Sequence, residues 1–332
     1  MQVTMKLILL LPLFTIVSTE TWDKDFWYNQ NAEELNLALQ QANTNVAKNL
    51  VLAIGDGMGV TTTTAIRVYR GQLTPGLLGE EALLSWDKFP HTGMSKTYCT
   101  DMTTTDSAAS ATAYHCGVKT KYEAIGVDDT VERNVCATVD GATVRSVLDL
   151  AAEEGKSVGI VTTDAVVGAS PSGAYAHVAL RDWRADYELP ADAVGVCKDI
   201  ARQLVEDNLD IRVVLGGGRQ YFLPTTKQDP EYSTKTGKRT DGQDLTTWLN
   251  AQKLRKRAAK YVTNKAQFDL ATANTTDYLF GLFERSRMQE ETERRVNKTE
   301  PSLAEMTEKA IQILSKNPRG FYLFVEEKIG QT

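Results

Sequence analysis

The sequence predicts an α/β fold in which a mainly parallel sheet is sandwiched between helices. Two observations support this class. Apolar segments of strand length alternate with segments whose apolar residues recur at helical spacing. The first strand-like segment, residues 49–54, is almost entirely apolar, as is typical of a parallel strand buried on both faces. At 332 residues the chain has a size that α/β enzymes often fold as one domain.

Four segments are predicted as strands of this sheet. The first runs directly into a glycine-rich loop, residues 55–59, which precedes a helical pattern, so the loop lies at the carboxyl end of its strand. The third is followed by three glycines. The four segments are 49–54, 157–163, 211–215 and 320–325.

Helices are predicted between and beside these strands. Residues 143–154 have helical apolar spacing and end at Gly155, residues 191–207 form a crossover helix, and residues 302–315 follow Pro301. The polar stretch 229–260 is expected to be a surface excursion with one helix at 245–256. Its basic residues lack interleaved aromatic side chains, which favours a solvated helix over a nucleic-acid site.

Charge and the N-terminal pattern indicate the compartment and exclude one class of partner. The net charge of −6 argues against binding a polyanion such as nucleic acid by bulk attraction. Lys6 precedes an apolar run, residues 7–17, that is too short to span a bilayer comfortably, and small polar residues follow. We therefore expect a secretory signal peptide at residues 1–19, with residues 20–332 destined for the extracellular space or the cell surface.

Secretion makes cysteines candidates for disulfides and makes sequons candidates for glycosylation. The four cysteines allow three pairings, and none is arranged as the CxxC of a zinc cluster or redox pair. The sequons begin at Asn274 and Asn297. The cysteines are Cys99, Cys116, Cys136 and Cys197.

Polar side chains follow three of the predicted strands. Ligands of open α/β sheets bind beyond the carboxyl ends of the strands, so we expect these side chains to converge there. Carboxylate and hydroxyl oxygens would suit a hard cation such as Mg²⁺, although Asp56 is also a common type of turn residue. The residues are Asp56; Thr162, Thr163 and Ser170; and Glu326 and Glu327.

The glycine loop does not match a dinucleotide-binding fingerprint. Gly55, Gly57 and Gly59 are suitably placed, but Val60 stands where the third glycine of that motif belongs. Asp56 would also set a negative charge against the pyrophosphate.

Ser107 is the candidate nucleophile. It lies at the predicted start of a helix rich in small residues, where the helix dipole favours an anion; the alternative is that it or a neighbour is simply an N-cap. The Gly-x-Ser-x-Gly elbow of esterases is absent from the sequence. None of the three histidines, His91, His115 and His177, is placed by the sequence as a general base, so a metal would have to activate the serine.

Arg181 is the candidate phosphate ligand, because a guanidinium can bind two phosphate oxygens at once. The alternative is an exposed ion pair with Asp182 or Asp186. His177, nearby in the sequence, is expected to be structural.

Four motifs in the right order make the sequence similar to the animal alkaline phosphatases. The resemblance runs from about residue 27 to residue 326. The motifs are Gly55-Asp56-Gly57-Met58-Gly59; Asp106-Ser107 with Ala111-Thr112-Ala113-Tyr114; Ser170-Pro171-Ser172-Gly173-Ala174-Tyr175-Ala176-His177; and Asn317-Pro318-Arg319-Gly320-Phe321 with Phe324-Val325-Glu326.

The resemblance implies hydrolysis of phosphate monoesters with Zn²⁺ and Mg²⁺ as cofactors. Ser107 would become phosphoserine, and Arg181 would hold the phosphate. Asp56 would bridge a zinc and a magnesium ion, and Ser170 and Glu326 would complete the magnesium site.

The resemblance further implies a Cys136–Cys197 disulfide, a homodimer and, in a longer form of the protein, a lipid anchor at the membrane. It also implies a calcium site. Its ligands would be Glu231, Phe283, Glu284 and Glu300.

The sequence departs from this family in three places. Gly168 stands where relatives have histidine, and Ala108 replaces the glycine of their Asp-Ser-Gly. After Glu326 the family continues with an Asp-His-Gly-His-His run that supplies zinc ligands, whereas this sequence continues differently. We therefore expect a shortened form of a longer enzyme, with low or absent activity of its own, and a last strand at an open sheet edge.

Two other functions fit the same residues. One is a catalytically inactive isoform that binds metal or phosphate. The other is a sulfatase-like or phosphodiesterase-like member of the wider superfamily.

Overall fold

The computed structural model describes residues 29, 32–33, 35–36, 39 and 45–329. These fall into two compact units, Met1–Val46 with Leu84–Gly93, and Ala47–Leu83 with Met94–Thr332. The smaller unit contains a short 3₁₀ helix, η1 (Ser85–Lys88). The predicted signal peptide lies outside the described residues, and within them no helix has the length and apolar character needed to cross a membrane.

The larger unit is built on a six-stranded sheet in which every pair of neighbours is parallel. The strand order is β1-β6-β2-β3-β5-β4. The predicted fold class is therefore confirmed. The strands are β1 (Leu50–Asp56), β2 (Ser157–Ala165), β3 (Val213–Gly217), β4 (Ala259–Val262), β5 (Tyr278–Leu282) and β6 (Phe321–Lys328).

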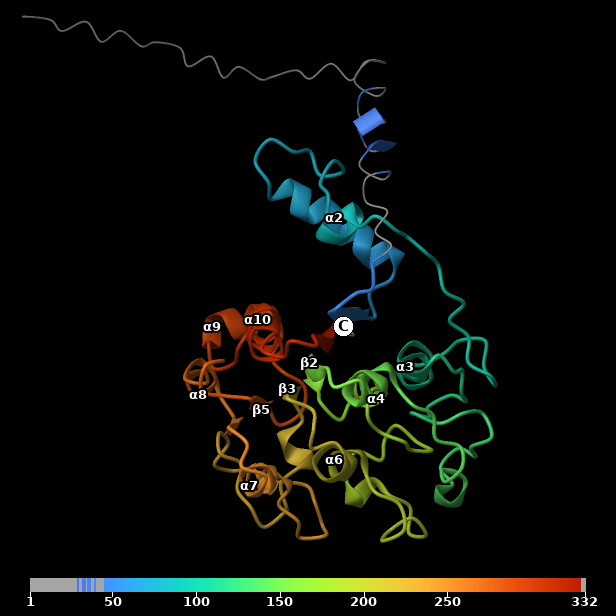
Figure 1. Ribbon diagram of the computed structural model, residues 1–332, viewed down its shortest axis with the longest axis vertical. Helices are drawn as coiled ribbons and strands as arrows, with labels where there is room; N and C mark the ends of the chain where they lie inside the picture. Colours follow the sequence, from blue (N-terminus) through green and yellow to red (C-terminus); the bar gives the residue numbers. More distant parts are fainter. Residues whose placement is uncertain (1–28, 30–31, 34, 37–38, 40–44, 330–332) are drawn as a thin grey trace, which may run out of the picture. The chain divides into compact units, whose positions relative to one another are not determined.

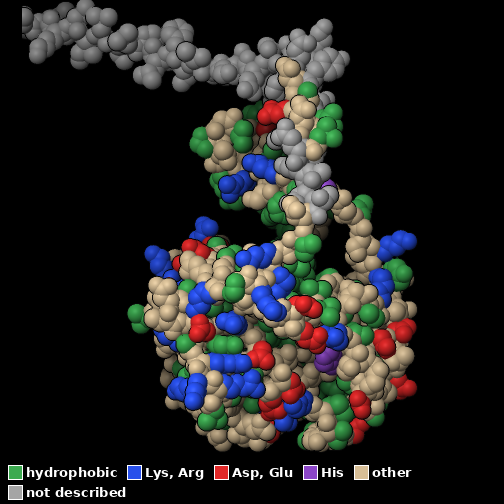
Figure 2. Space-filling model, in the orientation of Figure 1, with side chains coloured by type: hydrophobic (Ala, Val, Ile, Leu, Met, Phe, Trp, Pro, Cys, Tyr) green, Lys and Arg blue, Asp and Glu red, His purple; other side chains and the backbone are tan. Residues whose placement is uncertain are grey.

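Helices flank this sheet, with α8, α9 and α10 beyond one face and α3, α4 and α6 beyond the other (Figure 1). Charged side chains of both signs are interspersed on the face of the larger unit that Figure 2 shows. The helices are α2 (Val60–Gln72), α3 (Ser107–Cys116), α4 (Val147–Glu153), α5 (Ala169–Ser172), α6 (Ile200–Arg202), α7 (Trp248–Leu254), α8 (Lys265–Asp269), α9 (Glu291–Asn297) and α10 (Leu303–Leu314).

Strand β6 separates two apolar cores, because successive side chains of a strand point to opposite faces of the sheet. Leu323 and Val325 pack with the buried side of α10, whereas Tyr322 and Phe324 pack with the core that contains α3 and α4 residues. By the same alternation Glu326, the next residue in this series, belongs to the face covered by α3. The strand therefore carries a carboxylate to the end of the sheet beside that helix.

All four predicted strands are present, but β4 and β5 were not predicted. Strand β4 is short and begins where the expected polar excursion ends, so its sequence has few of the apolar residues by which a strand is predicted. It pairs only with β5. The expectation that the last strand lies at the open edge is wrong. Strand β6 pairs with both β1 and β2, and the two edge strands of this sheet are β1 and β4.

Two predicted helices begin later than expected. The helix predicted at 143–154 begins at Val147, because Ser146 caps it through a reciprocal bond pattern with Asp149. The helix predicted at 191–207 begins only at Ile200 and ends in a π-helical turn. The residues before it form turns, and one of them, Gly195, has a φ of 77°, which a helix cannot accommodate.

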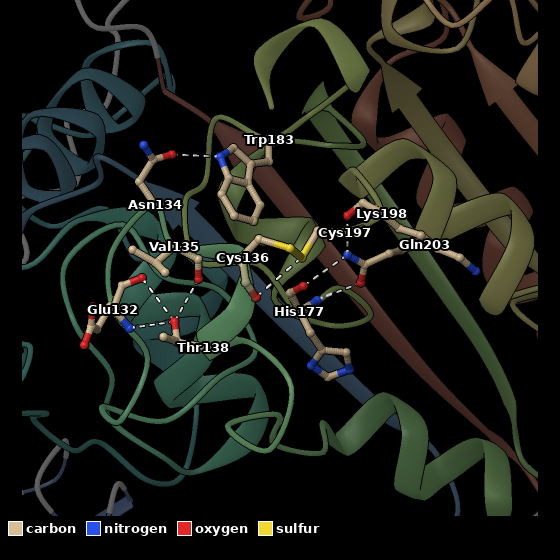
Figure 3. Close-up of a disulfide and its surroundings, with 10 residues drawn as sticks. All are labelled: Glu132, Asn134, Val135, Cys136, Thr138, His177, Trp183, Cys197, Lys198 and Gln203. Carbon is tan, nitrogen blue, oxygen red and sulfur yellow. Dashed lines mark hydrogen bonds between the residues drawn. A yellow bond between two sulfur atoms is a disulfide. The ribbon is translucent and has the colours of Figure 1, made fainter. Parts of the chain in front are cut away.

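A disulfide joins Cys136 to Cys197, as the family resemblance implied (Figure 3). It ties the turns before α6 to the short 3₁₀ helix η2 (Cys136–Thr138). Hydrogen bonds from Gln203 to the carbonyl oxygens of His177 and Lys198 fix the same region. Cys99 and Cys116 remain thiols.

Removal of this disulfide is expected to lower the free energy of unfolding by about 4 kcal/mol, because the bond closes a loop with a sequence separation of 61 residues. The measurement is urea unfolding of the double variant Cys136→Ser/Cys197→Ser. Cys99→Ser is the matched control, since a serine hydroxyl can replace the thiol as donor to Asp101 and to the Met102 carbonyl oxygen. Equal unfolding midpoints for the two proteins would contradict the prediction.

Candidate active site

Ser107 is the first residue of α3, and its hydroxyl is directed at Asp56. The Oγ atom donates to the Asp56 carboxylate at 3.3 and 3.2 Å. The N-cap is Asp106, whose carboxylate accepts the backbone N–H groups of Ala108 and Ala109. Because the neighbouring aspartate caps the helix, the serine hydroxyl is not needed for that purpose.

Asp56 lies at the end of β1 and is held by the neighbouring strand. It is paired in register with Lys328 of β6, and the Lys328 ammonium donates to the Asp56 carboxylate. The carboxylate therefore accepts from a serine on α3 and from a lysine on β6. These two contacts, and not a hydrogen bond within a turn, fix the position of the Asp56 carboxylate.

Arg181 contacts neither of the two aspartates proposed for an ion pair from the sequence. Its Nη1 donates to Asp106 Oδ2 at 2.9 Å, while Asp182 pairs with Arg184. The Arg181 side chain is 30% exposed. Its guanidinium is therefore bound to Asp106, the residue that precedes Ser107, and it is partly exposed to solvent.

Glu326 is fully buried on the face of β6 beside α3. The Thr162 hydroxyl donates to its Oε2 at 2.6 Å, whereas Oε1 has no hydrogen-bond partner. Burial raises the pKa of this carboxyl to about 7, and the charges of Asp164 and Asp56 add to that effect. The hydroxyls of Thr162 and Ser170 act in the opposite direction.

The donor set around Glu326 suits a magnesium ion. The set consists only of oxygens, and Glu326 Oε1 is buried without a hydrogen-bond partner. An orphaned buried carboxylate oxygen is costly unless a cation or water satisfies it. The strand pairing places Asp56 two residues beyond the register partner of Glu326, and the Ser170 hydroxyl lowers the pKa of Glu326.

The same residues do not fit a pair of zinc sites. His115 is fully buried, with its two ring nitrogens at the Ser170 carbonyl oxygen and the Tyr322 hydroxyl, and burial lowers its pKa to about 4. One ring nitrogen of His177 is hydrogen-bonded to the Gly126 carbonyl oxygen, as a structural histidine would be. Across the described part of the chain, no group of three or more His, Cys, Asp or Glu side chains is arranged to hold a metal ion.

Gly168 is required by its surroundings. A Cβ atom at this position would approach the Ala165 carbonyl oxygen to 2.9 Å and Asp164 Oδ2 to 3.2 Å. A side chain here would therefore require the backbone at Ala165 to shift and would crowd the Asp164 carboxylate. The glycine that departs from the family pattern thus leaves room for an aspartate that sequence reasoning missed, as it also missed Tyr114 and Lys328.

The residues predicted for calcium influence one another electrostatically. Glu300 is buried, its Oε1 has no partner, and burial raises its pKa to about 7, with Glu284 and Glu231 contributing. Glu231 accepts from Arg219, and Glu284 accepts from Tyr232. Phe283, which follows β5, donates its backbone N–H to the Gly216 carbonyl oxygen.

Both sequon asparagines, Asn274 and Asn297, are exposed.

Comparison with known proteins shows which family this arrangement belongs to. A family model described as alkaline phosphatase matches residues 47–329. The chain belongs to the alkaline phosphatase family. It is 48% identical over 318 residues to the tissue-nonspecific alkaline phosphatase of Gallus gallus and 47% identical over 318 residues to that of Homo sapiens. These alignments cover 94% of this chain but 61% and 60% of the relatives, so the chain spans about three fifths of their length.

Solved bacterial alkaline phosphatases share the fold. The Shewanella sp. enzyme superposes with a TM-score of 0.59 at 26% identity, covering 84% of this chain and 56% of that enzyme. The Thermus thermophilus enzyme gives 0.63 at 25%, covering 87% and 52%. A variant of the Antarctic TAB5 enzyme, with a TM-score of 0.60, 25% identity and coverage of 84% and 64%, is described as having Mg bound in its M3 site.

Replacing Glu326 by glutamine is expected to remove a pH dependence of stability. The folded carboxyl has a pKa of about 7 against a reference value of 4.5, so the folded state binds the extra proton between these values. The free energy of unfolding should then fall as pH rises through this window, by on the order of 3 kcal/mol. Above pH 7 that penalty is complete.

The measurement is the urea unfolding of Glu326→Gln and of the unmodified chain in metal-free buffer between about pH 4.5 and pH 8. The stability difference between the two should grow across the window in favour of the glutamine variant. The exposed carboxylate variant Glu308→Gln is the control and should run parallel to the unmodified chain. A constant difference for Glu326→Gln would refute the assignment.

Proposed function

We propose that this protein acts on phosphate monoesters by transferring the phosphoryl group to Ser107. The observation that carries the proposal is the placement of the serine Oγ. It lies at the N-terminus of a ten-residue helix, it donates to the Asp56 carboxylate, and it adjoins the Asp106–Arg181 pair. The family membership of the chain supports this assignment.

The first step forms a bond between Ser107 Oγ and phosphorus and breaks the bond from phosphorus to the ester oxygen. Asp56 accepts the hydrogen bond of the hydroxyl, which orients an oxygen lone pair toward the phosphorus and provides an acceptor for the proton. The leaving oxygen takes up a proton from water, and the proton accepted by Asp56 is released to the solvent. Water then attacks the phosphoserine, which regenerates the serine hydroxyl and releases inorganic phosphate.

The protein offers the phosphate a positive environment on one side of the serine. The first backbone N–H groups of α3 carry the positive end of the helix dipole, although Asp106 already accepts two of them. The Arg181 guanidinium would bind the phosphate oxygens, and its bond to Asp106 fixes its position.

Magnesium is the cofactor that the described residues support. Asp56, Ser170 and Glu326 would hold it, and a bound Mg²⁺ would supply positive charge beside the serine and the phosphate. Zinc is proposed from the family only, because the described residues lack the nitrogen-rich donors it prefers. A calcium ion at Glu231, Phe283, Glu284 and Glu300 is proposed on the same family basis.

The cellular context is also proposed from the family. The disulfide and the exposed sequons support passage through the secretory pathway to the extracellular space or cell surface. A homodimer and lipid anchoring in a longer form are proposed as well.

Covalent labelling of Ser107 is expected when the chain is mixed with a phosphate monoester and quenched in acid. The phosphopeptide should be located by mass spectrometry. Ser107→Ala should abolish the label because it removes the attacking oxygen. Ser110→Ala, which alters a serine of the same helix that contacts Thr105, should retain it.

The labelling distinguishes the proposed chemistry from a binding-only isoform. Label without release of phosphate over many turnovers would indicate that the second step is slow. Failure to label the unmodified chain in the presence of Mg²⁺ would favour the catalytically inactive alternative.

A panel of esters is expected to separate the phosphatase from the sulfatase-like and phosphodiesterase-like alternatives. The nitrophenyl phosphate monoester should react faster than the corresponding diester and sulfate ester by about a hundredfold or more, a difference of about 3 kcal/mol in transition-state stabilisation. The measurement is the initial rate of nitrophenol release with Mg²⁺ and Zn²⁺ supplied. A preference for the diester or the sulfate would overturn the monoester assignment.

A further inference from the structure

The side chain of Lys328 contacts Asp56, the residue that the family resemblance implies would bind two metal ions. Its ammonium donates to Asp56 Oδ2, and the two side chains are only 15% and 19% exposed. Each of the two Asp56 oxygens also accepts from Ser107. The positive charge on this carboxylate is thus supplied by the polypeptide itself.

Backbone pairing, and not a flexible tail, brings Lys328 to this place. The residue is the register partner of Asp56 in the parallel pair of β1 and β6. Its backbone N–H donates to the Thr163 hydroxyl at 2.9 Å, and the N–H of Ile329 donates to the Asp56 carbonyl oxygen at 3.1 Å. Hydrogen bonds from the backbone N–H groups of Lys328 and Ile329 therefore fix the backbone from which the lysine side chain extends.

The charged groups of the candidate site are unevenly matched. Asp106 is satisfied by Arg181 and by backbone N–H groups, and Asp56 is paired with Lys328. Glu326 is fully buried, has no cationic partner among its hydrogen bonds, and leaves Oε1 unpartnered. One carboxylate of the proposed magnesium site is neutralised from within the chain, and the other is not.

We propose that Lys328 is an internal competitor of the divalent cation, holding Asp56 in the metal-free protein and lowering the affinity of the site for Mg²⁺. A cation bound between Asp56 and Glu326 would lie beside a fixed positive charge on the same carboxylate. Two like charges at close range in a partly buried site repel each other more strongly than they would in water. Binding of the ion therefore requires the ammonium to leave Asp56.

This inference rests on the proposed function only in naming Mg²⁺ as the ion. Its tests use no substrate, so a chain that never reacts with a phosphate monoester can still support or overturn it.

The first test is calorimetric titration of Mg²⁺ into the full chain and its variants. Lys328→Met keeps the length of the stem and removes the charge, and it should bind Mg²⁺ at least about tenfold more tightly. Lys328→Arg keeps a positive charge and should bind as weakly as the unmodified chain. The matched control is Lys227→Met, which removes the lysine of another Lys–Asp pair, with Asp244, and should leave the affinity unchanged.

The double variant Asp56→Asn/Lys328→Met locates the effect. It should lose the gain in affinity, because the carboxylate released by the lysine substitution is then absent. An unchanged affinity for Lys328→Met, an equal gain for Lys227→Met, or a gain that survives in the double variant would each overturn the proposal.

A second test uses the unmodified chain, in case the substitutions impair folding. Lys328 should be protected from an amine-reactive acetylating reagent without metal and should become several-fold more reactive when Mg²⁺ is added. Acetylation is located by mass spectrometry, with Lys227 as the internal reference. Reactivity of Lys328 that does not change with Mg²⁺ would overturn the proposal.

Discussion

The parallel pairing of β1 with β6 is the constraint on which the candidate site depends. The pairing aligns the ends of two strands that are more than 260 residues apart in the sequence, with Asp56 opposite Lys328 and Glu326 two residues earlier on β6. Pairing of β6 with β2 on its other side places Thr162 opposite Glu326. Because the strands are parallel, their carboxyl ends meet at one edge of the sheet, and the polar residues that follow them converge there.

The helix that begins at Ser107 is capped by Asp106 and not by the serine that we propose as the nucleophile. Asp106 caps α3, accepts a third backbone N–H from Glu123, and binds Arg181. A single carboxylate thus begins the helix, positions the guanidinium and leaves the serine hydroxyl directed at Asp56. The start of this helix can therefore be capped while the Ser107 hydroxyl stays free of that task.

Two buried carboxyl groups, Glu326 and Glu300, each have one oxygen without a hydrogen-bond partner. Natural proteins rarely bury a carboxylate whose oxygen has no hydrogen bond, because the desolvation is not compensated. Glu326 has this property at the proposed magnesium site, and Glu300 has it at the proposed calcium site. At both positions burial raises the pKa to about 7, as expected for a group whose charged form lacks its counter-ion.

The sequence by itself determined the α/β class, four of the six strands, the motif residues and, through family resemblance, the Cys136–Cys197 pairing. These features depend on local apolar patterns and on motif order, which a single chain displays directly. The tertiary structure alone decided that β6 is an inner strand, that Asp106 binds Arg181, and that Lys328 lies on Asp56. It also decided that β4 and β5 extend the sheet. These features arise from strand order and register between distant segments, and no local pattern encodes which strand a segment will lie beside.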